Sequence, residues 1–174
     1  SKVEVHVYDL SQGLARQLSM QFLGRQIDGV WHTGIVVYGR EYYFGGGIQN
    51  DSPGLTPYGR PVETIDLGET QLPQEVFEEY LVEISPRFTM ATYNLLENNC
   101  NHFTQEAALF LTGKSIPERI SGLPLEVLNS PMGPLLRSMM DRFNAAGGAP
   151  AFMAGGGMGG APAFAGFPPA SAPP

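Results

Sequence analysis

The segment Glu97-Asn98-Asn99-Cys100-Asn101-His102-Phe103 decides how this chain is organised, because it places the start of a helix at the only cysteine. Asparagine is a favoured N-cap residue, so the asparagines before Cys100 are expected to begin a helix that holds the cysteine in its first turn. Apolar residues then recur at helical spacing, and Gly113 supplies a C-terminal stop. The pattern predicts a helix over residues 100–112.

A cysteine in the first helical turn has a chemical use. Unpaired N–H groups and the positive end of the helix dipole favour a thiolate, so this placement is expected to lower the pKa of Cys100. The same N–H groups could donate to an oxyanion, as nucleophilic acyl transfer requires. The alternative is that Cys100 is a small buried hydrophobic residue with no chemical role.

A general base would have to come from the three histidines. His102 is two residues beyond the cysteine, and a two-residue step turns helical side chains apart. His6 alternates with valines and is expected to be a surface histidine on a strand. His32 interrupts an otherwise apolar β segment, where a buried polar group needs a partner, so Cys100 and His32 are the predicted catalytic pair. Four residues remain open as a third, orienting group: Asn94, Asn98, Asn101 and Asp66.

The surrounding pattern predicts an α+β fold with a small antiparallel sheet packed against helices. Alternating residues 3–8 are expected to form a strand, followed by a helix behind Ser11. Further strands are expected over 27–38, 41–44 and 62–67, with a Gly- and Pro-rich loop at 45–61. Pro73 should open a helix that runs to about residue 84, and one or two helices interrupted by prolines are expected over 123–143.

Length and composition favour one domain, over residues 1–144, followed by a tail over residues 145–174. The chain has 174 residues, and the final 30 are dominated by Ala, Gly and Pro and carry no charge, so they cannot build a packed core. The tail is expected to be disordered, as a linker or as a segment whose Phe and Met residues engage a partner. Its many helix breakers exclude a membrane span.

The charge and cysteine content narrow the function classes. A net charge of −7 makes a nucleic-acid partner unlikely, and one cysteine excludes intramolecular disulfides. The His and Cys spacing fits no usual zinc site, so neither a metal nor a cofactor is expected. We expect the protein in the cytoplasm and possibly also in the nucleus. Residues 61–86 contain seven acids and no base, which fits either a solvated helix face or a docking surface for a basic partner.

The chain resembles the PPPDE thiol peptidases over roughly residues 3–143. The resemblance is carried by these stretches: Val7-Tyr8-Asp9-Leu10-Ser11, Gly29-Val30-Trp31-His32-Thr33, Tyr43-Phe44-Gly45, Tyr93-Asn94-Leu95, Asn99-Cys100-Asn101, Phe110-Leu111-Thr112-Gly113 and Ile116-Pro117. The family order of histidine before cysteine is kept, whereas the Ala/Gly/Pro tail departs from the family pattern.

This resemblance implies a circularly permuted papain-like cysteine peptidase fold, with Cys100 as nucleophile and His32 as general base and acid. It implies a cysteine isopeptidase that removes SUMO or ubiquitin from lysine side chains of target proteins. An alternative with the same dyad is a thioesterase that acts on S-acylated proteins, and a homodimer is also implied. A non-catalytic binding module, using the acidic helix or the tail, is the remaining interpretation.

Overall fold

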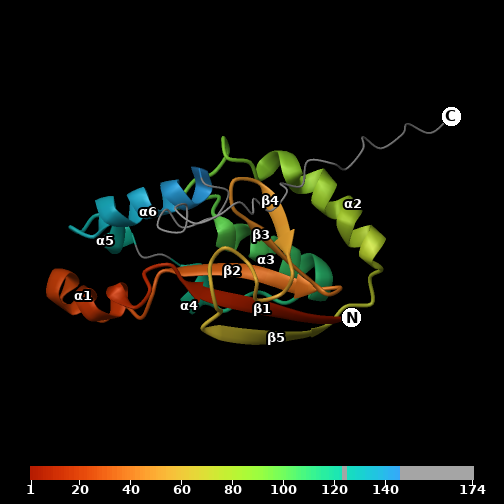
Figure 1. Ribbon diagram of the computed structural model, residues 1–174, viewed down its shortest axis with the longest axis horizontal. Coiled ribbons are helices and arrows are strands. Elements are labelled where there is room, and N and C mark those ends of the chain that lie inside the picture. The colour runs from red at the N-terminus through yellow and green to blue at the C-terminus, as the bar shows by residue number, and fades with distance from the viewer. Residues whose placement is uncertain (123–124, 146–174) are drawn as a thin grey trace.

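Five strands form one antiparallel sheet in the computed structural model, which describes residues 1–122 and 125–145. The strands are β1 (Lys2–Asp9), β2 (Trp31–Val37), β3 (Arg40–Phe44), β4 (Ile48–Asp51) and β5 (Glu63–Glu69). Their order across the sheet is β4-β3-β2-β1-β5, so β2 is the central strand and β4 and β5 form the two edges (Figure 1). The antiparallel sheet predicted from the alternating segments is therefore present.

Helices surround this sheet. They are α1 (Leu14–Leu23), α2 (Gln74–Ile84), the 3₁₀ turn η1 (Ser85–Arg87), α3 (Cys100–Thr112), α4 (Glu118–Ser121), α5 (Leu125–Leu128) and α6 (Gly133–Ala145). Helix α3 packs against β2 and β3 and lies behind the sheet in Figure 1, whereas α1 lies beyond one end of the sheet. The predicted α+β class is confirmed.

One face of the sheet forms the core with α3. The register pairs Val5 with Ile35 and Val7 with Thr33, so alternate residues of β1 and β2 point to the same side. These four side chains are fully buried, and Phe103 of α3 is buried with them. Burial of this apolar surface is the main force that holds the helix on the sheet.

The turn between β2 and β3 consists of Tyr38 and Gly39, one residue earlier than the sequence suggested. Their φ angles are 52° and 72°, and a two-residue hairpin turn with positive φ at both positions matches the right-handed twist of the strands. Glycine adopts this conformation without steric cost, whereas Tyr38 adopts it inside the constraint of the hairpin.

The expected start of the first helix was wrong. Helix α1 begins after Gly13 rather than after Ser11, because the Asp9 carboxylate accepts hydrogen bonds from the N–H groups of Ser11 (2.9 Å) and Gly13 (2.9 Å) and forms a turn there. The apolar residues that open α2 differ in burial, since Val76 is 38% exposed while Phe77 is buried.

Two short elements had no usable signal in the sequence. Strand β4 lies inside the stretch expected to be loop, and its first two residues are both buried, so it shows no alternation of apolar and polar residues. Helix α4 has four residues, too few for a helical period to be read.

The other face of the sheet carries polar side chains instead of a second apolar layer. Glu41 on β3 is fully buried, and its carboxylate accepts hydrogen bonds from the Tyr8 hydroxyl (2.6 Å) and the Gly54 N–H (3.0 Å). His6 Nδ1 lies 2.7 Å from the same carboxylate. The expectation that His6 is a surface histidine was therefore wrong, because Glu41 draws it into a buried cluster.

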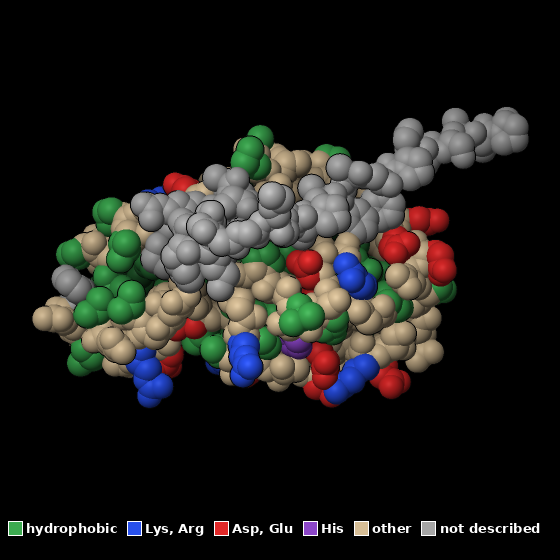
Figure 2. Space-filling model, in the orientation of Figure 1, with side chains coloured by type: hydrophobic (Ala, Val, Ile, Leu, Met, Phe, Trp, Pro, Cys, Tyr) green, Lys and Arg blue, Asp and Glu red, His purple; other side chains and the backbone are tan. Residues whose placement is uncertain are grey.

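The remaining sequence expectations concern the surface and the tail. Acidic side chains gather beside α2 (Figure 2), where Glu75, Glu79 and Glu83 are exposed. Helices α5 and α6 fall within the helical stretch expected near the C-terminus. Among the described residues, no helix has the length and apolar character needed to cross a bilayer. The predicted tail lies outside the described residues, apart from its first residue.

We expect Gly34→Ala to destabilise the fold, because a Cβ at Gly34 would lie 2.6 Å from Oε2 of the buried Glu41. Over-packing of this kind costs about 1–3 kcal/mol. Urea unfolding measures the loss, with Gly122→Ala as the matched control, since a Cβ there meets only a backbone oxygen at 3.4 Å. Equal unfolding free energies for the two variants would contradict the close approach of Glu41 to Gly34.

Candidate active site

The helix start at Cys100 is fixed by a reciprocal cap. The side chain of Asn99, the N-cap residue, accepts hydrogen bonds from the N–H groups of Asn101 (2.9 Å) and His102 (3.3 Å). In return, Nδ1 of His102 accepts a hydrogen bond from the Asn99 N–H at 3.0 Å. Cys100 is thus the first residue of a 13-residue helix, as predicted, and His102 belongs to the cap.

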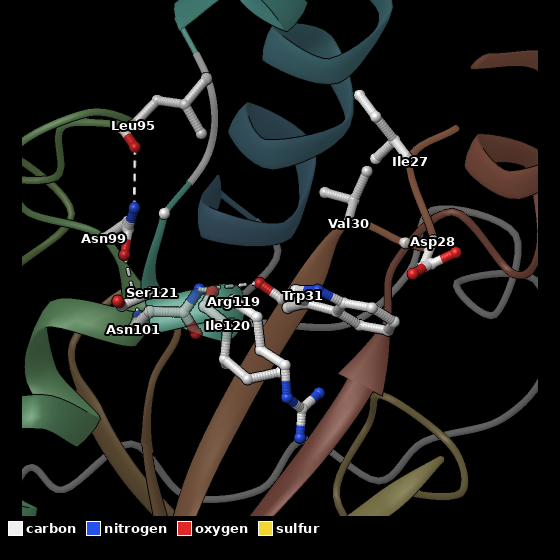
Figure 3. Close-up of a pocket in the computed structure, with 12 residues that line it drawn as sticks. Ile27, Asp28, Val30, Trp31, Leu95, Asn99, Asn101, Arg119, Ile120 and Ser121 are labelled. Carbon is white, nitrogen blue, oxygen red and sulfur yellow. Dashed lines mark hydrogen bonds between the residues drawn. The ribbon is translucent and has the colours of Figure 1, made fainter. Parts of the chain in front are cut away.

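Asn101 ties this helix start to strand β2 on both sides of His32. Its Oδ1 accepts a hydrogen bond from the Thr33 hydroxyl at 2.8 Å, and its Nδ2 donates to the Trp31 carbonyl at 2.9 Å (Figure 3). The same Nδ2 also donates to the Ile120 carbonyl at 3.3 Å. Because Trp31 and Thr33 flank His32, this amide sets the position of the helix start relative to the histidine strand.

The Cys100 thiol lies in this junction and is 3% exposed. Its Sγ is 3.8 Å from Oδ1 of Asn101, which can accept a hydrogen bond from the thiol. Burial raises the pKa of Cys100 to about 12, although the backbone N–H groups of Thr33, Asn101 and Cys100 lower it. The lowered thiol pKa expected from the helix dipole is therefore wrong for this structure, because desolvation of the thiolate outweighs the nearby donors.

His32 is 1% exposed and lies on β2, on the face opposite the α3 core. Burial lowers the pKa of its imidazole to about 3. Its Nε2 is buried and has no hydrogen-bond partner within the described part of the chain. An unpaired buried nitrogen costs about 1–3 kcal/mol, and such atoms call for a specific explanation. A reacting group that arrives with a substrate is one such explanation.

The two predicted site residues thus lie on elements that pack together. Cys100 touches β2 through the Thr33 backbone, one residue beyond His32, and helix α3 packs on that strand. Both groups are neutral at pH 7 in this state, since the thiol pKa lies above 7 and the imidazole pKa lies below it.

The structure distinguishes the four residues that the sequence left open as a third, orienting group. Asn101 is the one that contacts both elements of the site. Asn94 and Asn98 instead bond each other through their backbones, in the loop before α3. Asp66 lies on β5, where its carboxylate accepts a hydrogen bond from Gly68 N–H at 2.7 Å and lies 3.7 Å from the amine of Lys2.

Tyr58 belongs to the site and had no signal in the sequence. Its ring stacks on the His32 imidazole, with the centroids 3.5 Å apart and the planes 18° from parallel. It comes from the loop between β4 and β5, 26 positions from His32, and no local period links the two residues.

A pocket of about 180 Å³ lies on the Trp31 side of the junction, with Asn99, Asn101 and Ile120 in its wall (Figure 3). The sequence leaves Trp31 open as either a core residue or part of a groove wall, and the structure shows it half-buried in the wall of this pocket. A Cβ at Gly29 would lie 2.5 Å from the Trp31 ring, so the missing side chain allows the indole to approach the backbone. Over residues 1–122 and 125–145, no group of three or more His, Cys, Asp or Glu side chains is placed to hold a metal ion.

Comparison with known proteins agrees with this architecture. Residues 1–141 match the family described as "PPPDE putative peptidase domain". Desumoylating isopeptidase 1 of Homo sapiens is 49% identical over 141 residues, which cover 80% of this chain and 84% of that protein. Desumoylating isopeptidase 1 of Xenopus laevis is 45% identical over 141 residues, with 80% and 83% coverage.

A more distant relative is less similar, and the match covers less of its length. DeSI-like protein sdu1 of Schizosaccharomyces pombe is 38% identical over 135 residues, covering 71% of this chain and 66% of that protein. With a family match over residues 1–141 and relatives that share nearly half of their aligned residues, this chain belongs to the PPPDE peptidase family.

Proposed function

We propose that this protein is a cysteine isopeptidase that removes SUMO from lysine side chains of target proteins. The observation that carries the proposal is the similarity to Desumoylating isopeptidase 1 over four fifths of the chain, in a protein whose single cysteine begins a helix packed on the His32 strand. In this proposal Cys100 is the nucleophile and His32 is the general base and acid.

The first half of the reaction forms an acyl-enzyme. His32 accepts the Cys100 proton, and the sulfur attacks the carbonyl of the modifier's C-terminal glycine, which is joined to the lysine amine. Backbone N–H groups at the start of α3 are the donors for the oxyanion of the tetrahedral intermediate. His32 then gives its proton to the leaving lysine amine as the C–N bond breaks, which leaves a thioester on Cys100.

The second half returns the enzyme to its starting state. His32 takes a proton from water, the resulting hydroxide attacks the thioester carbonyl, and the C–S bond breaks. The modifier leaves with a free carboxylate, and the proton held by His32 returns to the sulfur. Burial of both side chains keeps the pair neutral before substrate binds, so the ion pair forms as part of turnover and not at rest.

We expect Cys100→Ser and His32→Ala each to lower the release of SUMO from an isopeptide-linked lysine peptide by at least about a thousandfold, because each removes a group used in every bond-making step. The measurement is single-turnover release followed by mass spectrometry. His102→Gln is the matched control, since it removes a histidine of the same helix while glutamine can still accept the cap hydrogen bond. Full release of SUMO by Cys100→Ser would contradict Cys100 as the nucleophile, whereas no release by the unaltered chain would favour the binding-module interpretation.

The same assay separates the substrates that the family resemblance leaves open. SUMO, ubiquitin and a palmitoylated peptide are presented at equal concentrations, and we expect kcat/KM to be highest for SUMO. A thiolate is a better leaving group than an amine, so release of the acyl group with the same dependence on Cys100 also fits the dyad. Faster cleavage of ubiquitin than of SUMO would contradict the proposed modifier.

The buried neutral imidazole predicts how stability depends on pH. The His32 pKa is about 3 in the folded state and ordinarily 6.5, so only the unfolded state gains this proton between those values. The contribution of the neutral His32 to the free energy of unfolding is therefore fully present above pH 6.5 and is lost as the pH is lowered toward 3. Between pH 7 and pH 5 we expect wild type to lose about 2 kcal/mol more than His32→Gln in urea unfolding. Parallel losses in the two proteins would show that His32 is not held neutral.

A further inference from the structure

We infer that Tyr58 is a positioning residue of this site, which covers one face of the His32 imidazole and fixes the plane in which the ring exchanges protons. The inference rests on the proposed function of His32. Tyr58 takes the place of the third group, which in a Cys–His enzyme usually orients the imidazole through a hydrogen bond.

The contact itself carries the argument. The Tyr58 and His32 centroids are 3.5 Å apart with planes 18° from parallel, which is full face-to-face contact. Stacking covers a ring face, whereas the ring nitrogens of an imidazole lie at its edge. The contact therefore restricts tilting of the ring while Nε2, which is buried without a hydrogen-bond partner among the described residues, stays open within the ring plane.

Two further tyrosines hold Tyr58 and His32 in place. Tyr8 of β1 has its ring centroid 5.7 Å from that of His32 and 5.9 Å from that of Tyr58. Tyr43 of β3 has its centroid 6.0 Å from that of His32 and 5.6 Å from that of Tyr58. Their hydroxyls donate to the carboxylates of Glu41 and Asp51, each at 2.6 Å, so these rings are fixed to the sheet.

The loop that carries Tyr58 is attached to the sheet on both sides of it. Before Tyr58, the Gly54 N–H donates to the buried Glu41 carboxylate at 3.0 Å. After it, the Val62 N–H donates to the Val7 carbonyl at 2.7 Å. Tyr58 is therefore placed over His32 by specific bonds and not by the chance position of a surface loop.

The titratable groups that lie against His32 are Tyr8 from β1, Tyr43 from β3 and Tyr58 from the loop. The Cys100 thiol lies beside the backbone of the neighbouring Thr33. The carboxylates of Glu41 and Asp51 accept the hydrogen bonds of the Tyr8 and Tyr43 hydroxyls. The electron-rich faces of these rings also favour the imidazolium that forms during turnover. Removing the Tyr58 ring admits water to one face of His32, which restores solvation of the charged imidazole.

The test compares Tyr58→Ala with Tyr58→Phe, which keeps the stacked ring. Tyr80→Ala is the matched control, because Tyr80 makes a comparable stack elsewhere in the fold. Its ring lies on that of Phe110, with the centroids 3.8 Å apart and the planes 3° from parallel. The first readout is the ¹⁵N titration of the His32 ring, assigned with His32→Gln among only three histidines. The second readout is kcat and KM for release of SUMO from the isopeptide-linked peptide.

We expect Tyr58→Ala to move the His32 titration upward by at least one pH unit and to lower kcat about tenfold at pH 7, with KM within about threefold of wild type. Tyr58→Phe and Tyr80→Ala should stay within about twofold of wild-type kcat and keep its titration. Wild-type kcat in Tyr58→Ala would overturn the positioning role, whether or not the titration moves. An equal kcat loss in Tyr80→Ala would assign the effect to stability alone.

Nuclear Overhauser contacts between the Tyr58 and His32 rings in the unaltered chain give a second measurement that needs no variant to fold. We expect strong contacts, and their absence would overturn the stacking. If the unaltered chain releases no SUMO, the proposed function fails, whereas the contacts and the titration still decide whether Tyr58 covers His32.

Discussion

The amide of Asn101 is the interaction on which the arrangement of this site depends. It joins the first turn of α3 to the residues on both sides of His32, and its atoms have partners on β2, on α4 and at the Cys100 sulfur. Apolar packing alone would hold α3 on the sheet but would not fix how far the helix slides along it. A buried amide with several partners is directional, so it sets this position.

Burial decides the resting chemistry of the pair. The helix start offers N–H donors to the sulfur, and these lower the Cys100 pKa, yet the loss of water raises it further than they lower it. The same loss of water lowers the His32 pKa, so both groups rest in their neutral forms. Desolvation therefore dominates the titration of both groups, although each has polar neighbours.

The parts of the structure that follow from neighbouring residues could be predicted from the sequence. The Asn99 cap, the Gly113 stop and the alternation in β1 are local signals, and they located the cysteine helix and the central strand. The Glu41 cluster and the Tyr58 stack join residues 26 to 35 positions apart, and no helical or strand period connects such pairs. His6 was misassigned for the same reason, since alternation shows which side of a strand a residue occupies but not what covers that side.

The polar face of the sheet explains why a histidine can sit inside an otherwise apolar fold. On the α3 face, Thr33 and Ile35 pack into the core, and an imidazole there would displace apolar contacts. On the other face, Gly34 leaves room for the Glu41 side chain, Glu41 fixes Tyr8 and the loop before Tyr58, and the tyrosine rings enclose His32. Each step is a contact between different elements, so the environment of His32 exists only once the whole sheet has formed. The two candidate site residues therefore come from separately built parts of the fold, a capped helix start and a polar sheet face, which meet at the backbone of Thr33.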